Sequence, residues 1–152
     1  MDRIDQHMLM IIQQEGRLST ADLSDKVGLS PSPCARRLKR LEEEGYIVNY
    51  QANLNKAKIG IAMTFFVEVS LNSHQASSID EFELVIADMK EVINGYIVSG
   101  AYDYLLEVVS PDLAGFELFT RKLHRVKSVK DIHTHLSIRQ IKTKSPLPIY
   151  KS

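Results

Sequence analysis

The strongest constraint on this fold is a short turn, Gly28-Leu29-Ser30-Pro31, which separates two amphipathic segments. Glycine readily adopts the left-handed conformation that ends a helix, and a proline preceded by serine suits the start of the next helix. After the turn, apolar side chains recur at i, i+4 and i+7, at Cys34, Leu38 and Leu41. The sequence therefore predicts that one helix ends at this turn and that another begins there and buries one of its faces.

Two more helices are expected before the turn. Residues 5–15 carry apolar side chains near the helical period, and Gly16 follows them. Residues 19–22 have the pattern of an N-cap and an acidic first turn, and the short second helix then ends at Gly28. Three short helices with a glycine turn before the third are typical of a helix-turn-helix. We expect residues 46–51 to form a strand next, which would make it a winged variant.

The charge of the chain is balanced in total but uneven in its distribution. The chain has 19 lysines and arginines and 19 acidic residues, a total that by itself argues against binding to nucleic acid. Four of the five residues 36–40 are nevertheless cationic, and three glutamates follow at positions 42–44. The sequence therefore has a strong local basic patch, and it lies on the third predicted helix.

A basic third helix of this kind can enter the major groove of duplex DNA, where base edges are distinguishable. Serines and exposed amides at the helix start can bind phosphate, and arginines can bind guanine or phosphate. We predict that the DNA-contacting residues are Ser30, Ser32, Arg36, Arg37, Lys39 and Arg40. The alternative is a solvated helix face whose cations pair with the glutamates at 42–44. Which arginine reads a base stays open.

The rest of the chain alternates strands and helices. After a linker at residues 52–62, strands are expected at 64–71, 92–99, 104–110 and 129–141, with helices at 78–89 and from 110 onward. The order βαββαβ is the ferredoxin-like arrangement, so the fold class is α+β. We divide the chain into a helix-turn-helix domain at residues 1–60 and a second domain at 61–152. Residues 143–152 contain two prolines and are expected to form an extended arm.

A ferredoxin-like sheet covered by helices on one face leaves its other face bare. Phe66 is expected on that second face. An exposed apolar face usually needs a partner, and a homodimer through the two sheets is the simplest one. Such a dimer would also fix the separation of two recognition helices.

The turn at residues 100–103 is the best candidate for a small-molecule site. Glycine lets backbone amides approach a ligand, Tyr102 can form an apolar wall, and Asp103 can pair with an α-ammonium group. The residues alone fit a plain strand-to-strand turn better. Residues from the last strand of a neighbouring subunit could close such a pocket: Thr134, His135 and Ser137.

Other chemistry finds little support in the residues. Cys34 is expected in the core, not as a redox sensor. His133 and His135 share a strand face, but no third ligand for zinc is evident. We find no catalytic triad, phosphate loop or paired catalytic carboxylates, so an enzyme and a metabolite sensor without DNA binding are weaker alternatives. No cofactor, membrane span or secretory signal is predicted, and the expected location is the cytoplasm.

Three separated motifs give the sequence a resemblance to a known family. The run Leu29-Ser30-Pro31-Ser32-Pro33-Cys34-Ala35-Arg36-Arg37-Leu38-Lys39-Arg40-Leu41-Glu42 resembles the recognition-helix region of the Lrp/AsnC transcription regulators. Gly100-Ala101-Tyr102-Asp103-Tyr104-Leu105-Leu106 is similar to the turn of that family's sensing domain. The third match is Ile141-Lys142 followed by Ser145-Pro146-Leu147-Pro148. The resemblance covers essentially the whole chain.

The resemblance implies a transcriptional regulator that binds duplex DNA as a dimer and often assembles into tetramers or octamers. It implies that residues 1–60 bind DNA and that residues 61–152 sense the ligand and form the oligomer. An amino-acid effector would bind between these sensing domains near Gly100, Ala101, Tyr102 and Asp103. For this turn, the resemblance thus favours the ligand site over the plain turn.

Overall fold

The structure is a computed structural model that describes residues 1–143 and 145–150. The chain forms two compact units, one made of Met1–Asn53 with the tail from Lys142, and one made of Leu54–Ile141. The sequence-based division at residue 60 left the tail with the second domain, whereas contacts group the tail with the first unit. The functions assigned to the two domains stay proposals.

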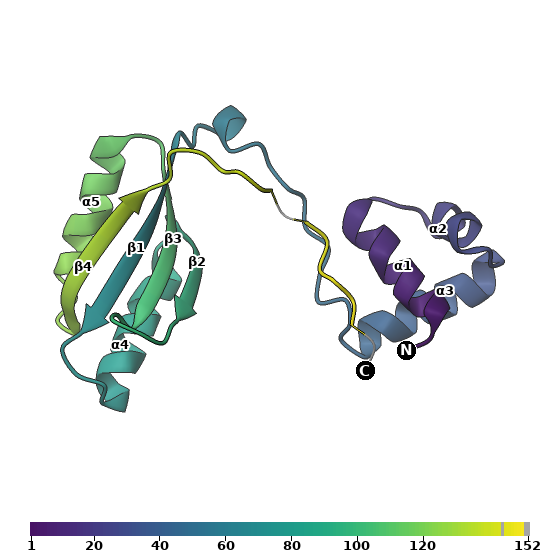
Figure 1. Cartoon of the computed structure of the whole chain (residues 1–152), viewed down its shortest axis with the longest axis horizontal. Helices are drawn as coiled ribbons and strands as arrows, with labels where there is room; N and C mark the ends of the chain where they lie inside the picture. Colours follow the sequence, from purple (N-terminus) through teal and green to yellow (C-terminus); the bar gives the residue numbers. More distant parts are fainter. Residues whose placement is uncertain (144, 151–152) are drawn as a thin grey trace. The chain divides into compact units, whose positions relative to one another are not determined.

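The first unit holds three helices, α1 (Arg3–Gln14), α2 (Thr20–Val27) and α3 (Pro31–Glu43) (Figure 1). Capping boxes start the first two helices: Asp2 with Asp5 on α1, and Ser19 with Asp22 on α2. Gly28 ends α2 at φ +69°, and Gly45 follows α3 at φ +75°. The three predicted helices and the left-handed glycine before α3 are confirmed.

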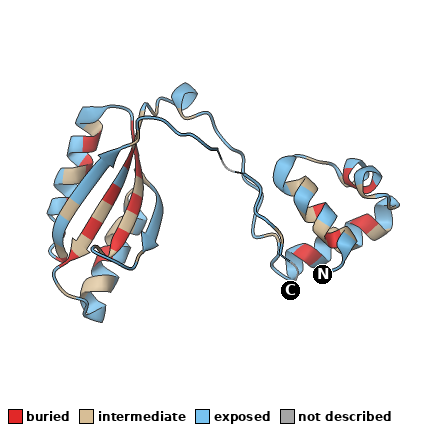
Figure 2. Cartoon of the chain, in the orientation of Figure 1, coloured by how far each residue is buried: buried red, intermediate tan, exposed pale blue. Residues whose placement is uncertain are grey.

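The core of this unit is small and comes from all three helices. Met8, Leu23, Cys34 and Leu41 are buried, and partly buried apolar side chains pack around them (Figure 2). Burying a side chain of this size stabilises the fold by about 1.5–3 kcal/mol. The spacing of Cys34 and Leu41 thus fixes which face of α3 turns inward, and with it the opposite face that stays exposed.

The strand predicted at residues 46–51 is wrong for the single chain. These residues have no regular secondary structure, and Val48 and Tyr50 are exposed. The alternation of apolar and polar residues was real, but a strand needs a hydrogen-bonding partner, and the described part of the first unit otherwise holds only helices.

The second unit is a four-stranded antiparallel sheet with two helices. Its strands are β1 (Met63–Leu71), β2 (Val92–Ile97), β3 (Tyr104–Ser110) and β4 (Val129–Leu136), in the order β2-β3-β1-β4. The helices are α4 (Ala76–Asp88) and α5 (Leu113–His124), and a 3₁₀ turn at Ala57–Ile59 precedes β1. This topology confirms the predicted ferredoxin-like βαββαβ fold.

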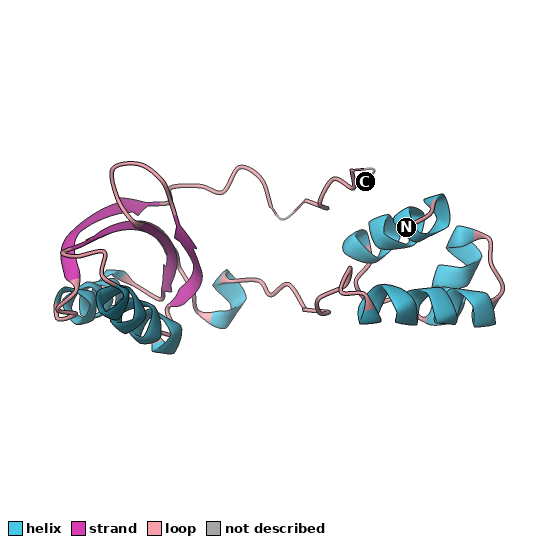
Figure 3. Cartoon of the chain, turned by 90° about the horizontal axis from the view of Figure 1, so that it is seen from below, coloured by secondary structure: helices cyan, strands magenta, loops and turns pink. Residues whose placement is uncertain are grey.

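Both helices cover the same face of the sheet (Figure 3). The core between them contains Phe65, Val67 and Val69 of β1, and the rings of Phe65 and Phe116 stack at 3.5 Å between centroids. Phe66 points to the opposite face and is 39% exposed, as predicted. One face of the sheet is therefore left open within a single chain.

The last strand is shorter than predicted, since β4 ends at Leu136 and not at Ile141. Its final backbone bond runs from the Ser137 N–H to the Thr64 carbonyl, close to the start of β1, so residues 138–141 have little of β1 left to pair with. Of the predicted arm, residues 144, 151 and 152 lie outside the described residues. In the described part, the side chain of Gln13 holds the Leu147 backbone N–H at 2.6 Å and its carbonyl at 3.3 Å.

Candidate DNA-binding and ligand-binding sites

The outer face of α3 carries Ser32, Arg36 and Lys39. They repeat at i, i+4 and i+7, the spacing of the buried Cys34, Leu38 and Leu41, but are offset by two residues. At 3.6 residues per turn this offset is about 200°, so the two sets lie on opposite sides of the helix. All three outer residues are exposed, and Arg36 has no hydrogen bond or ion pair with any described residue. This face can therefore meet a duplex without rearrangement.

Arg37 and Arg40 lie on a flank of the same helix and are held by α1. Arg37 Nη1 lies 2.6 Å from Asp2 Oδ2 and 2.8 Å from Asp5 Oδ1. Arg40 Nη2 lies 2.7 Å from Asp5 Oδ2. The three arginines are equivalent by sequence pattern, and the structure separates Arg36 from the other two. The acidic pair was missed: the capping-box spacing marks Asp2 and Asp5, but only the tertiary fold brings them to α3.

Two ion pairs with the glutamates at positions 42–44 do form. Lys39 Nζ lies 3.6 Å from Glu43, and Arg40 Nε lies 3.8 Å from Glu44. All four side chains are substantially exposed, and such surface pairs contribute about 0–1 kcal/mol. The basic face therefore remains accessible, and these weak ion pairs do not neutralise it.

Ser30 is the N-cap residue of α3, as a serine before proline suggested, but its side chain makes no cap hydrogen bond. The usual donors are the amides of the second and third helical residues. Here the third is Pro33, which has no N–H, and Pro31 also lacks one. The Ser32 amide is the one left for phosphate in this first turn, and the exposed hydroxyls of Ser30 and Ser32 remain free to donate.

In the second unit, the loop between β2 and β3 contains the predicted ligand turn. Gly100 has φ +132°, a conformation that side-chain-bearing residues rarely adopt. The Asp103 N–H donates to the Val69 carbonyl at 2.9 Å. The Asp103 carboxylate accepts the Leu71 N–H at 2.7 Å, and its other oxygen lies 2.8 Å from His74 Nε2. The pKa of Asp103 is lowered, mainly by the hydrogen bond from the Leu71 N–H and to a smaller extent by His74.

Two of the predicted ligand residues, Tyr102 and His135, lie near Glu68, a residue that the sequence did not single out. Glu68 lies on the open face of β1, where His135 Nε2 is 3.2 Å from its carboxylate and where Tyr102 is near enough for Glu68 to affect its pKa. Burial first, and then Glu68, raises the pKa of Tyr102. The alternation of strand 64–71 puts Glu68 on the same face as Phe66, which is the signal that could have found it.

The remaining predicted ligand residues are not brought together. The register pairs Thr134 with Val67 and His135 with Phe66, so Thr134 lies on the helix-covered side and His135 on the open side. Ser137 follows the end of β4. Gly100 and Ala101 are exposed in the loop.

The second unit also has an apolar cavity of about 350 Å³ between α4 and β2, which the sequence did not predict. None of the predicted ligand residues lines it. Its walls are formed by Phe82, Glu83, Ile86, Ala87, Gly95, Tyr96, Ile97, Tyr104 and Leu106. The Tyr104 hydroxyl donates to Glu83 at 3.1 Å, and burial together with this partner raises the pKa of Tyr104 to about 12.

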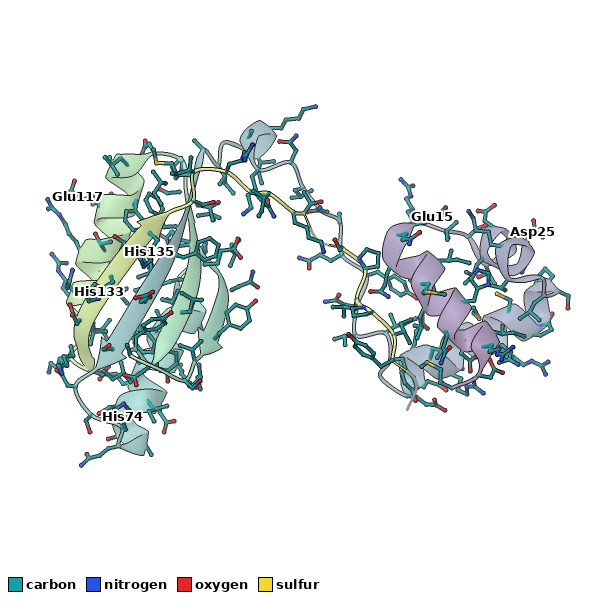
Figure 4. The ribbon with its side chains drawn as sticks, in the orientation of Figure 1. Glu15, Asp25, His74, Glu117, His133 and His135 are labelled. Atoms are coloured by element: carbon teal, nitrogen blue, oxygen red, sulfur yellow. The ribbon has the colours of Figure 1, made fainter. Side chains whose placement is uncertain are left out.

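The histidines of β4 pair with carboxylates instead of gathering around a metal. Figure 4 labels His133 and His135 along this strand; the first lies 3.7 Å from Asp131 and the second 3.2 Å from Glu68. Among the described residues, no three histidine, cysteine or acidic side chains are placed to hold a metal ion. In the same part of the chain, no helix is both long and apolar enough to cross a membrane.

A helix-turn-helix with an exposed basic third helix, carried on one chain with a ferredoxin-like unit, defines a two-domain DNA-binding regulator. Comparisons with known proteins agree. The Lrp/AsnC ligand binding domain matches residues 64–147, and a winged helix-turn-helix DNA-binding domain matches residues 1–48. The chain belongs to the Lrp/AsnC family of transcriptional regulators.

Relatives resemble this chain over nearly its full length. The leucine-responsive regulatory proteins of Escherichia coli and Salmonella typhimurium are 35% identical over 150 residues, which is 98% of this chain and 92% of theirs. A Neisseria meningitidis transcriptional regulator, crystallised as an L-Met complex, has a TM-score of 0.94 at 32% identity over 97% of this chain and 96% of its own. An AsnC family regulator from Agrobacterium tumefaciens reaches 0.92 at 37% identity, covering 97% of both chains.

Proposed function

We propose that α3 is the recognition helix and that its outer face reads duplex DNA. The observation that carries this proposal is the exposure of Ser32, Arg36 and Lys39 opposite the buried face of the helix. Arg36 is unpaired among the described residues, and its guanidinium suits bidentate donation to guanine. Lys39 and the hydroxyls of Ser30 and Ser32 suit phosphate contacts, which position the helix without reading sequence.

Arg37 and Arg40 take a different part in this proposal. Each already donates to carboxylates of α1, so neither is free to move as Arg36 is. Their remaining N–H groups can still face a phosphate at the edge of the groove. We therefore assign base reading to Arg36 first and a flanking role to the two restrained arginines.

We also propose an amino acid as the effector, bound at the loop between β2 and β3. The Neisseria meningitidis regulator described above was crystallised with L-Met, which supports this class of ligand. Each Asp103 oxygen uses one acceptor position, and a carboxylate has about four. The α-ammonium group of an amino acid can thus bind to Asp103 beside the exposed His74. The backbone amides of Gly100 and Ala101 would then approach the carboxylate of the amino acid.

In an oligomer, the open face of the sheet would bring further residues to this effector. Tyr102 and His135 both lie near Glu68 on that face. When two copies pack through their open faces, we place Tyr102 of one copy and His135 of the facing copy beside the ligand. Ser137 stays a candidate beside them, and Thr134 is the weakest, because it lies on the opposite face. We propose a homodimer through the open faces, assembling further to a tetramer or octamer, that acts in the cytoplasm without catalysing a reaction or using a cofactor.

A gel-shift titration of the full chain on duplex DNA at about 50 and about 200 mM salt tests the DNA-binding role. We expect affinity to fall steeply with salt. Arg36→Ala should weaken binding to a duplex enriched from a random pool by the wild-type chain. Arg121→Ala is the matched control, because Arg121 is an exposed arginine of α5 that pairs within its own helix. Binding that does not depend on salt, or equal losses in both variants, would refute the assignment to α3.

Thermal-shift screening against the twenty amino acids tests the effector, because a ligand that binds only the folded chain raises its apparent stability. We expect at least one amino acid to raise the melting temperature, and Asp103→Asn to reduce that rise. An unchanged melting temperature with every amino acid would remove the effector proposal and leave the DNA-binding proposal intact.

A further inference from the structure

The first turn of α1 contains a buried carboxylate that is shared by two arginines of α3. Asp5 is only 1% exposed. Its Oδ2 accepts the Asp2 N–H at 3.0 Å as part of the capping box that begins the helix. A carboxylate removed from water needs compensating partners, because desolvation strongly disfavours an unpaired charge.

Arg37 and Arg40 are those partners. Arg37 Nη1 donates to Asp5 Oδ1 at 2.8 Å and to Asp2 Oδ2 at 2.6 Å. Arg40 Nη2 donates to Asp5 Oδ2 at 2.7 Å. The side chains of Arg37 and Arg40 are 28% and 46% exposed, so they are restrained at the surface and not enclosed. One buried charge thus fixes the position of two of the four cations in the basic patch.

The other two cations are not restrained in this way. Arg36 has no partner among the described residues, and Lys39 contacts only the exposed Glu43, at 3.6 Å, with its own side chain 75% exposed. The basic patch is therefore divided into an unrestrained outer pair, Arg36 and Lys39, and a flanking pair, Arg37 and Arg40, that is held by Asp5.

We propose that Asp5 is a positioning residue that sets sequence specificity by confining Arg37 and Arg40 to the flank of α3, where they reach a phosphate at the edge of the groove only when the helix is docked on its preferred sequence. This inference rests on the proposed role of α3 as the recognition helix. Each cation that neutralises a phosphate strengthens binding to all sequences alike and steepens the salt dependence by about 0.9. Restraining two arginines thus lowers non-specific affinity and raises the ratio of specific to non-specific binding.

Asp5→Asn in the full chain tests this proposal. The protein is titrated onto a random-sequence duplex and onto a duplex enriched from a random pool by the wild-type chain. With both arginines released, we expect tighter binding to the random duplex at low salt. The salt slope should steepen by up to about 1.8, which is roughly a tenfold larger loss of affinity between 50 and 200 mM. The preference for the enriched duplex should fall.

Controls separate this effect from charge and from damage to the fold. Asp25→Asn removes the same charge from an exposed site on α2 (Figure 4) with no described side-chain partner, and should leave the slope unchanged. Adding Arg37→Gln and Arg40→Gln to Asp5→Asn should abolish the steeper slope, which a merely structural role for Asp5 would not do. Asp2→Asn keeps a residue that can cap the helix but removes one of the two carboxylates that hold Arg37. It should therefore steepen the salt slope by a smaller amount, and it tests the proposal even if Asp5→Asn does not fold.

The measurements distinguish a failure of the proposed DNA-binding function from a failure of the role of Asp5. A wild-type chain without salt-dependent DNA binding would overturn the proposed function itself. A wild-type chain that binds normally, with Asp5→Asn and Asp2→Asn weakening random and enriched duplexes equally and without a steeper slope, would overturn the role of Asp5 alone.

Discussion

The carboxylate of Asp103 accepts a hydrogen bond from the Leu71 N–H at 2.7 Å, and so ties the loop before β3 to the end of β1. The same carboxylate faces His74, in the segment that leads from β1 to α4 (Figure 4). The residue that the sequence assigned to a ligand therefore also fixes the loop in which it lies.

Asp103→Ala should destabilise the folded chain by about 1–2 kcal/mol, because it leaves the Leu71 N–H without its acceptor. Asp103→Asn keeps an acceptor and should cost less. Since folding lowers the pKa of Asp103, its stabilisation is present above about pH 4 and is lost at lower pH. Urea unfolding at neutral and acidic pH measures both effects, with the exposed Asp88→Asn as control. Equal stability of Asp103→Ala and wild type would remove the structural role.

Gly100→Ala should cost about 1–3 kcal/mol through backbone strain alone, because Gly100 has φ +132° and open space where a Cβ would lie. Gly16→Ala is the matched control: its surroundings are equally open and its φ is not positive, so we expect little change or slight stabilisation. Chemical denaturation of the two variants compares them directly. A similar response of both would mean that the loop relaxes around the new side chain.

Phe66→Arg should reduce the molecular mass in solution, because it puts a charge on the open sheet face that we propose to be the dimer interface. Leu84→Arg places the same charge on an exposed position of α4, on the helix-covered side, and should leave the mass unchanged. Sedimentation velocity measures both. A dimer that survives Phe66→Arg would exclude this face from the interface.

Tyr104 should make the fold sensitive to alkaline pH. Its pKa is raised to about 12 in the folded chain, so the stabilisation from its protonated hydroxyl is complete below pH 10 and is lost between about 10 and 12. Tyr104→Phe should therefore be less stable than wild type at neutral pH, by about 1 kcal/mol, and lose less stability near pH 11. Urea titrations at the two pH values measure this, and parallel losses in both proteins would contradict it.

Cys34 should react with a thiol reagent only as the first unit unfolds, because its side chain is fully buried and burial raises the pKa of its thiol. Cys34→Ser should be less stable than wild type by about 1–3 kcal/mol, since it buries a polar hydroxyl among the apolar side chains of this core. Labelling rates in increasing urea provide the measurement. Rapid labelling of the folded protein would reopen the redox-sensor alternative.

The sequence by itself determined which faces are buried and where the helices of the first unit begin and end. Those features depend on neighbours in the chain: the spacing of Cys34, Leu38 and Leu41, the cap at Ser19 and the left-handed Gly28. The βαββαβ order also followed from local periodicity, because alternation in strands and 3.6-residue spacing in helices are properties of single segments.

Only the tertiary structure decided which cations of α3 are restrained, because Asp5 and Arg40 are 35 positions apart and no local pattern links them. It also decided that residues 46–51 and 137–141 do not form strands, since a strand exists only where a second strand supplies its hydrogen bonds. The grouping of Glu68 with Tyr102 and His135 depends on strand register, which is set by pairing between distant segments.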